Sequence, residues 1–125
     1  MIGFTLDAGA LIALERGDER MRGFVARAFA LGQEVRLPAA VVAQVWRDPA
    51  RQARLAKFVR DPHVQHVPMD LSMAKTVGLL CRATGTADVV DAAVAVCARI
   101  HTDYVVTGDP DDMRRLVDPT RVVPV

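Results

Sequence analysis

The chain has little cysteine and little lysine, and it has no apolar run long enough to cross a bilayer. Its 125 residues include two cysteines, Cys81 and Cys97, which are far apart and show no paired metal-ligand spacing. Both lie in apolar, helix-like runs, so we expect buried, reduced thiols in a cytoplasmic protein. The N-terminus has no basic leader, and no run approaches the roughly 20 apolar residues of a membrane span.

The basic residues are nearly all arginine, because lysine occurs only at Lys57 and Lys75. We interpret this as a coding bias rather than as a design for binding phosphate. The net charge of +1 argues neither for nor against a nucleic-acid partner, since local patches matter more than the sum. At this length we expect one domain over residues 1–125.

Short apolar runs alternate with segments of helical periodicity along the chain. This pattern predicts an α/β fold with three layers (α/β/α) and a central, mostly parallel sheet of about five strands. The predicted strands cover residues 2–6, 34–37, 63–67, 103–107 and 121–125. The predicted helices cover residues 8–16, 19–31, 39–47, 50–60, 70–83, 89–100 and 111–117, with helix 89–100 apolar all round and therefore deeply buried.

Aspartates stand where apolar segments end. Asp7 follows the first predicted strand, Asp91 lies in the most apolar helix, and Asp109 and Asp112 follow the fourth strand. In parallel sheets, ligands bind beyond the carboxyl ends of the strands, where the strand order reverses. We therefore expect these acids to share one edge of the sheet.

Each aspartate also has a plain structural explanation. Asp7 would cap the following helix, Asp88 and Asp91 would complement a helix dipole, and Asp111 or Asp112 would cap the helix after the fourth strand. Asp91 fits this explanation least well, because no lysine or arginine lies within a helical turn of it and an unpaired buried charge is costly. A shared site is the better explanation of the whole pattern.

A set of hard oxygen donors suits Mg²⁺ or Mn²⁺ rather than zinc. A pair of such ions can orient a water and stabilise the leaving 3′ oxygen, which makes phosphodiester hydrolysis the natural reaction. Other phosphoryl-transfer sites do not fit, because the sequence has no G-x-x-x-x-G-K-[ST] loop and no second aspartate two positions after Asp7.

The segments LDAGALIAL, AVVAQVWR, DVVDAAVAV and VVTGDPDDM, in this order and spacing, resemble the PIN-domain family over essentially the whole chain. Within it, they resemble the VapC-type toxins of bacterial toxin–antitoxin pairs. The resemblance implies a Mg²⁺- or Mn²⁺-dependent endoribonuclease, commonly a homodimer, that is held inactive by a cognate antitoxin. It also implies that Asp7, Asp91 and Asp109 bind the metal, with Asp112 as a further catalytic acid and Asp88 in an outer position.

The sequence departs from the family pattern at Gln44, where the family usually has a glutamate. Glutamine offers a carbonyl oxygen but no negative charge, so we expect weaker metal binding. This leaves an alternative, in which a PIN fold with lost or attenuated nuclease activity works by binding RNA or a protein. A third reading, a structural α/β domain with capped helices only, predicts no ion-dependent thermal shift.

RNA would have to be held by local positive charge. Five basic residues follow a helix-like spacing, and they are either a solvated face or an RNA track: Arg47, Arg51, Arg54, Lys57 and Arg60. Arg114 and Arg115 follow the acids directly and are better placed to touch the scissile strand.

Overall fold

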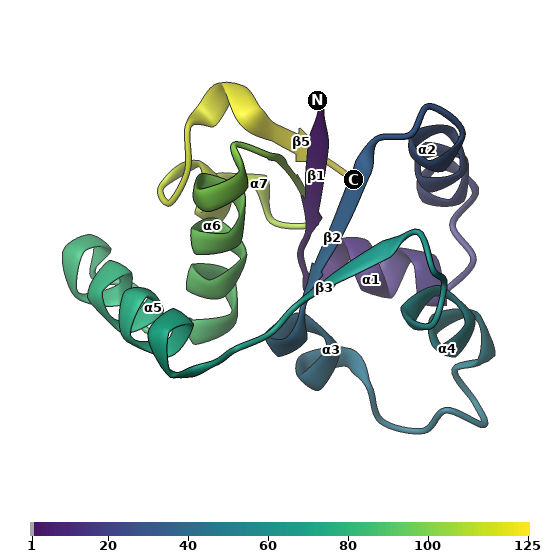
Figure 1. Cartoon of the computed structure of the whole chain (residues 1–125), viewed down its shortest axis with the longest axis horizontal. Helices are drawn as coiled ribbons and strands as arrows, with labels where there is room; N and C mark the ends of the chain where they lie inside the picture. Colours follow the sequence, from purple (N-terminus) through teal and green to yellow (C-terminus); the bar gives the residue numbers. More distant parts are fainter. Residues whose placement is uncertain (1) are drawn as a thin grey trace.

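The computed structural model describes residues 2–125, and five parallel strands form its centre (Figure 1). The strands are β1 (Gly3–Leu6), β2 (Glu34–Pro38), β3 (Val64–Val67), β4 (Tyr104–Thr107) and β5 (Val122–Pro124). Their order across the sheet is β3-β2-β1-β4-β5, and each neighbouring pair is parallel. The chain builds outward from β1 to β3 and then crosses back to β4. The strand order therefore reverses between β1 and β4, which is where a ligand site is expected in such a sheet.

Helices cover both faces of the sheet and confirm the predicted three-layer α/β/α fold (Figure 1). One face carries α1 (Ala8–Glu15), α2 (Glu19–Ala30) and α4 (Ala53–Val59), and the other carries α6 (Val89–His101) with α5 (Leu71–Thr84) packed outside it. The short helix α3 (Ala39–Val45) contacts both α1 and α6, and α7 (Pro110–Arg114) lies against β4 and β5. A 3₁₀ turn (Pro119–Arg121) precedes β5.

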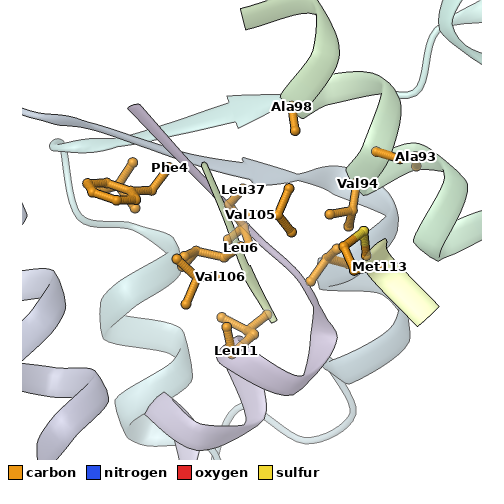
Figure 2. Close-up of a cluster of buried hydrophobic side chains, with 14 of the residues drawn as sticks. Phe4, Leu6, Leu11, Leu37, Ala93, Val94, Ala98, Val105, Val106 and Met113 are labelled. Atoms are coloured by element: carbon orange, nitrogen blue, oxygen red, sulfur yellow. The ribbon is translucent and has the colours of Figure 1, made fainter. Parts of the chain in front are cut away.

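The core lies on both sides of β1 and β4, where the strands are apolar at almost every position. Leu6, Val105 and Val106 are fully buried, and Figure 2 shows them among the side chains of the central cluster. Alternation of apolar and polar residues is missing here because both faces of the sheet are covered. Residues 92–98 of α6 are also buried, but Val89 and Ile100 at its ends are exposed. The prediction that this helix is buried all round is therefore wrong at its two ends.

The predicted helix over residues 50–60 begins only at Ala53, because residues 46–52 form a loop around one buried side chain. The side-chain oxygen of Gln52 (Oε1) accepts hydrogen bonds from the backbone N–H groups of Arg47 (2.9 Å) and Asp48 (3.0 Å). Its amide donates to the carbonyl of Val45 (3.0 Å) and to Glu15 (3.1 Å). One glutamine thus satisfies the backbone groups that the interruption leaves without helical partners.

The cysteines are both free thiols, with Cys97 buried and Cys81 half-buried. Among residues 2–125, no helix combines the length and the apolarity that crossing a membrane requires.

Candidate metal centre

Asp7 stands at the carboxyl end of β1 and begins helix α1. Its Oδ1 accepts hydrogen bonds from the backbone N–H groups of Ala10 (2.9 Å) and Gly108 (3.3 Å), and the Thr107 hydroxyl also bonds to the carboxylate. The residue is 4% exposed. Burial raises the pKa of Asp7 above its ordinary value, although the hydrogen bonds from these groups and from the backbone of Gly9 act to lower it. The donors fix the orientation of the carboxylate but do not neutralise its charge.

A close backbone contact holds the turn after β1 against the turn after β4. A Cβ on Gly9 would lie 2.7 Å from the Cα of Gly108, and one on Gly108 would lie 2.9 Å from the Cα of Gly9. Real Cβ contacts are not this short, so both positions need glycine as long as the turns stay this close. The contact brings the N–H of Gly108 within reach of Asp7 and keeps Asp109 next to the first strand.

Asp109 follows β4 and is held by the same threonine. Its backbone N–H donates to Thr107 Oγ1 (2.8 Å), and its side chain accepts a long hydrogen bond from the N–H of Asp112 (3.5 Å) as the cap of α7. The expectation that Asp111 or Asp112 caps this helix is therefore wrong. A hydrogen bond and the negative charge of Asp109 raise the pKa of Asp112, while Asp111 pairs with Arg114 (2.9 Å).

Asp91 lies in the first turn of α6, where Asp88 accepts a hydrogen bond from its N–H (2.9 Å) as the helix cap. Burial, followed by the negative charges of Asp88, Asp7, Asp109 and Asp112, raises the pKa of Asp91 to about 6. The charges that act on Asp91 belong to its own helix and to the segments after β1 and β4. Acids from three segments far apart in the sequence therefore lie near enough to influence one another.

No ion pair neutralises the centre of this cluster. Within residues 2–125, Asp7, Asp91 and Asp109 have no lysine, arginine or histidine within ion-pair distance. Helix capping and membership of a site are both true of three of these acids. Asp7, Asp88 and Asp109 each cap a helix, and each also contributes negative charge that raises the pKa of Asp91. Capping does not account for Asp91, which caps nothing and is half-buried among like charges.

The donor set fits a hard divalent cation, because it consists of carboxylate oxygens and carries uncompensated negative charge. In the described part of the chain, no three of these acids each bring a carboxylate oxygen within 4.8 Å of the other two. Mg²⁺ keeps several waters and takes only one or two carboxylates directly, so a site for it does not require three acids to meet at one point. Gln44 lies on α3, which packs against α1 and α6, and its side chain is exposed.

A second group of metal-ligand types lies elsewhere, and sequence reasoning missed it. Atoms of Cys97, His101 and Asp103 all lie within 4.8 Å of one another. The spacing of four residues between Cys97 and His101 was the available signal. A cation is disfavoured here because the Arg36 guanidinium already pairs with Asp103 at 2.5 Å. Burial also raises the pKa of the Cys97 thiol, which keeps it protonated and a poor ligand.

The basic segment predicted as a possible RNA track does not form one helical face. Arg47 and Arg51 lie in the loop before α4, and the Arg47 guanidinium donates to the carbonyls of Ala43 (3.0 Å) and Trp46 (2.7 Å). Arg54 and Lys57 are on α4 and line a groove between α2 and α4. The helix-like spacing was misleading because Gln52 and Pro49 interrupt the helix.

Comparison with known proteins places this geometry in a family. The sequence model of the PIN domain matches residues 4–118. No curated protein sequence matches the chain. Among solved structures, DNA-bound VapBC from Salmonella typhimurium is similar with a TM-score of 0.72 and 16% identity, covering 99% of this chain and 98% of that one.

Two further structures share the fold. VapBC2 from Rickettsia felis, bound to a promoter DNA fragment, has a TM-score of 0.71 and 12% identity, covering 98% of both chains. VapC20 from Mycobacterium tuberculosis, described as a toxin that cleaves the sarcin–ricin loop, has a TM-score of 0.61 and 17% identity, covering 85% of this chain and 91% of that one. At these identities the structures show a common fold. The match of the family model over nearly the whole chain shows that this protein belongs to the PIN domain family.

Proposed function

We propose that this protein is a Mg²⁺- or Mn²⁺-dependent endoribonuclease and the toxin of a toxin–antitoxin pair. The observation that carries the proposal is the group of acids that act on Asp91, at the point where the strand order reverses. Within residues 2–125, none of Asp7, Asp91 and Asp109 is paired with a cation. Membership of the PIN domain family and the fold shared with VapBC structures support it. We also propose that residues 1–125 form a single domain that acts in the cytoplasm.

In this proposal Asp7, Asp91 and Asp109 hold the metal, and Asp112 acts as a further acid beside it. A bound divalent ion supplies Lewis-acid polarisation of the phosphodiester and stabilises charge on the leaving oxygen. The protein's own contribution is orientation, because Ala10, Gly108 and Thr107 fix the Asp7 carboxylate before any ligand arrives. Water attacks the phosphorus, and the bond to the 3′ oxygen breaks.

The test is cleavage of single-stranded RNA with Mn²⁺ by the purified protein and by its Asp7→Asn and Asp91→Asn variants. A catalytic metal ion contributes several kcal/mol to the transition state, so each variant should lose roughly 100-fold or more in rate. Unfolding curves should show that both variants stay folded. Wild-type levels of cleavage in either folded variant would refute the assignment.

A second function is favoured by one observation, the glutamine at position 44. Gln44 is exposed on α3 and brings no charge to the site, which fits a PIN protein that binds RNA or a protein without cutting. The Gln44→Glu variant separates the two functions. A cleaving enzyme with a weakened site should gain metal affinity and rate by roughly 10-fold or more, whereas a protein that only binds should gain metal affinity without cleavage.

We propose an antitoxin as the protein partner, since several similar structures are VapBC complexes. A groove of about 560 Å³ between α2 and α4 is suited to a partner segment. The apolar residues that line it are Leu14, Val25, Phe29 and Phe58, and the charged ones are Glu19, Arg22, Arg54, Lys57 and Asp61. Because the cations outnumber the acids, this lining favours an amphipathic partner segment with acidic flanks.

We also propose a homodimer. Helix α5 stands at the edge of the molecule and packs on α6 (Figure 1). Its Leu71 and Leu79 are 71% and 66% exposed. Large apolar side chains left in water at such a face are typical of an interface between chains. Light scattering on the wild type and on Leu79→Lys tests this, because the substitution should shift a dimer toward monomer.

A further inference from the structure

A cavity of about 260 Å³ is lined in part by the acid cluster itself and extends between the turn that joins α5 to α6 and the end of helix α7. It is smaller than most small-molecule sites, which run from about 300 to 1,000 Å³. That size suits one unit of a longer chain better than a free ligand. The residues that line it are Thr84, Gly85, Thr86, Asp88, Asp91, Asp112, Arg115 and Leu116.

Two neighbouring arginines of this region differ in their surroundings. Arg115 lines the cavity, and its guanidinium is 3.9 Å from the Asp112 carboxylate. Arg114 does not line the cavity and pairs with Asp111 at 2.9 Å, so the expectation that both arginines touch the scissile strand is kept only for Arg115. Among the described residues that line the cavity, Arg115 is the one cation. The long, exposed pair with Asp112 contributes little, so Arg115 is free to exchange it for a phosphate.

The turn between α5 and α6 also lines the cavity, and it offers a hydroxyl with a spare proton. Thr86 Oγ1 accepts a hydrogen bond from the N–H of Asp88 (3.1 Å), which leaves its own O–H to donate. The Thr84 hydroxyl is different, because it already donates to the carbonyl of Leu80 (2.8 Å). Gly85 has a φ of +76° and turns the chain sharply between the two threonines. Arg115 and Thr86 therefore present two donors to an anion.

We propose that this cavity is the subsite for the RNA phosphate next to the scissile one, bound by Arg115 with the help of Thr86. The inference rests on the proposed ribonuclease function and adds to it the residues that position the substrate. Asp88, Asp91 and Asp112 repel a free anion from this cavity. A phosphate can still enter when it is covalently linked to a second phosphate that a divalent cation holds at the acids. A phosphodiester strand meets this requirement, because its phosphates are linked at a fixed spacing.

The experiment compares Arg115→Ala with Arg114→Ala, a matched control that loses an ion pair of the same i, i+3 spacing on the same helix. Steady-state cleavage of single-stranded RNA with Mn²⁺ should show KM raised about tenfold in Arg115→Ala, with kcat nearly unchanged. The slope of log affinity against log salt should fall by about 0.7, as expected for one lost phosphate contact on a single strand. Arg114→Ala should change neither quantity, and Arg115→Lys should recover part of the loss.

A second readout does not depend on cleavage. Fluorescence anisotropy with a labelled single-stranded RNA and Mg²⁺ measures binding when each arginine variant is combined with Asp7→Asn. The acids must stay intact for the neighbouring phosphate to be held, so the binding is also measured without the Asp7→Asn change, with Ca²⁺ in place of Mg²⁺. Weaker binding in the Arg115 variant alone supports the subsite, even when the wild type cuts no RNA and the ribonuclease function fails. Equal binding and equal KM for the two arginine variants, in an enzyme that does cleave, overturns the subsite and leaves the ribonuclease function standing.

Discussion

The buried carboxylates at the two ends of β1 and β4 differ in whether a cation pairs with them. At the amino end, Asp103 is 2% exposed, pairs with the Arg36 guanidinium at 2.5 Å and accepts a hydrogen bond from Thr5 (2.8 Å). At the carboxyl end, Asp7 is 4% exposed and receives only neutral donors. The same sheet therefore holds one neutralised acid and one cluster with negative charge to spare.

The difference indicates which acid belongs to the fold and which belongs to a ligand site. A buried carboxylate that has its own arginine needs no further partner, and a cation added there would have to compete with that arginine. Carboxylates that raise one another's pKa are costly in the metal-free protein and gain from a cation. Glycines take part at both ends, because a Cβ on Gly3 would lie 2.2 Å from an Asp103 oxygen and 2.6 Å from the Arg36 guanidinium.

The largest effect on stability should come from breaking the neutralised end. Asp103→Ala leaves the largely buried Arg36 guanidinium without its partner, which should lower the free energy of unfolding by roughly 3–5 kcal/mol. Urea denaturation measures this loss. The double variant Arg36→Leu with Asp103→Ala removes both charges and should recover much of it. A loss below about 1 kcal/mol in the single variant would contradict the contrast between the two ends.

A smaller effect on stability, with a clear effect on the site, should follow from Gly108→Ala. The new methyl group must push the Asp7 and Asp109 turns apart, which should cost about 1–3 kcal/mol. Misplacing the acids by about 1 Å should lower Mn²⁺ affinity and the cleavage rate by roughly 10- to 100-fold. Calorimetric titration with Mn²⁺ measures the affinity.

Gly23→Ala is the matched control for this substitution. Gly23 lies on α2 with nothing within 4 Å of the added Cβ, so alanine should stabilise the protein by about 0.5–1 kcal/mol through helix propensity. Metal affinity should stay at the wild-type value. If Gly108→Ala behaves like Gly23→Ala, the contact between the two turns does not position the acids.

The smallest effect should be a pH dependence that originates at Asp91. Its pKa of about 6 in the folded protein lies above the value of 3.8 expected for the unfolded chain, so the folded state holds this proton more tightly. As the pH rises from about 4 to 6, this group should make the metal-free protein less stable. Above that window both states are ionised and the penalty is fully present.

Thermal unfolding of metal-free wild type and Asp91→Asn at pH 5 and pH 7 measures this contribution. The variant should melt higher than the wild type at pH 7, and the difference should shrink at pH 5. Comparison with the variant is needed because the pKa of Asp7 is also raised, which gives the wild type a similar trend from a second group. A difference that does not change with pH would show that Asp91 is not held among like charges.

Much of the fold followed from local patterns. The five strands appear within one or two residues of their predicted positions, because apolar runs bounded by Gly, Pro and Asp leave few alternatives. A helix break at Pro49 was expected, but its extension over residues 46–52 was not, since it depends on the Gln52 side chain bonding to the backbone of Val45, Arg47 and Asp48. No local sequence pattern predicts that a glutamine side chain will be buried with four hydrogen-bond partners.

The sequence by itself determined the parallel α/β architecture and the positions of the acids at the ends of its strands, because hydrophobic periodicity and helix caps are local properties. Only the tertiary structure decided which acids lie together and which are neutralised. Arg36 and Asp103 are separated by 67 residues and Asp7 and Gly108 by 101, so their contacts depend on how the strands are ordered in the sheet. Whether a carboxylate is neutralised depends on which charges lie near it in space. For that reason the sequence alone did not distinguish Asp103, which Arg36 neutralises, from the unpaired acids Asp7, Asp91 and Asp109.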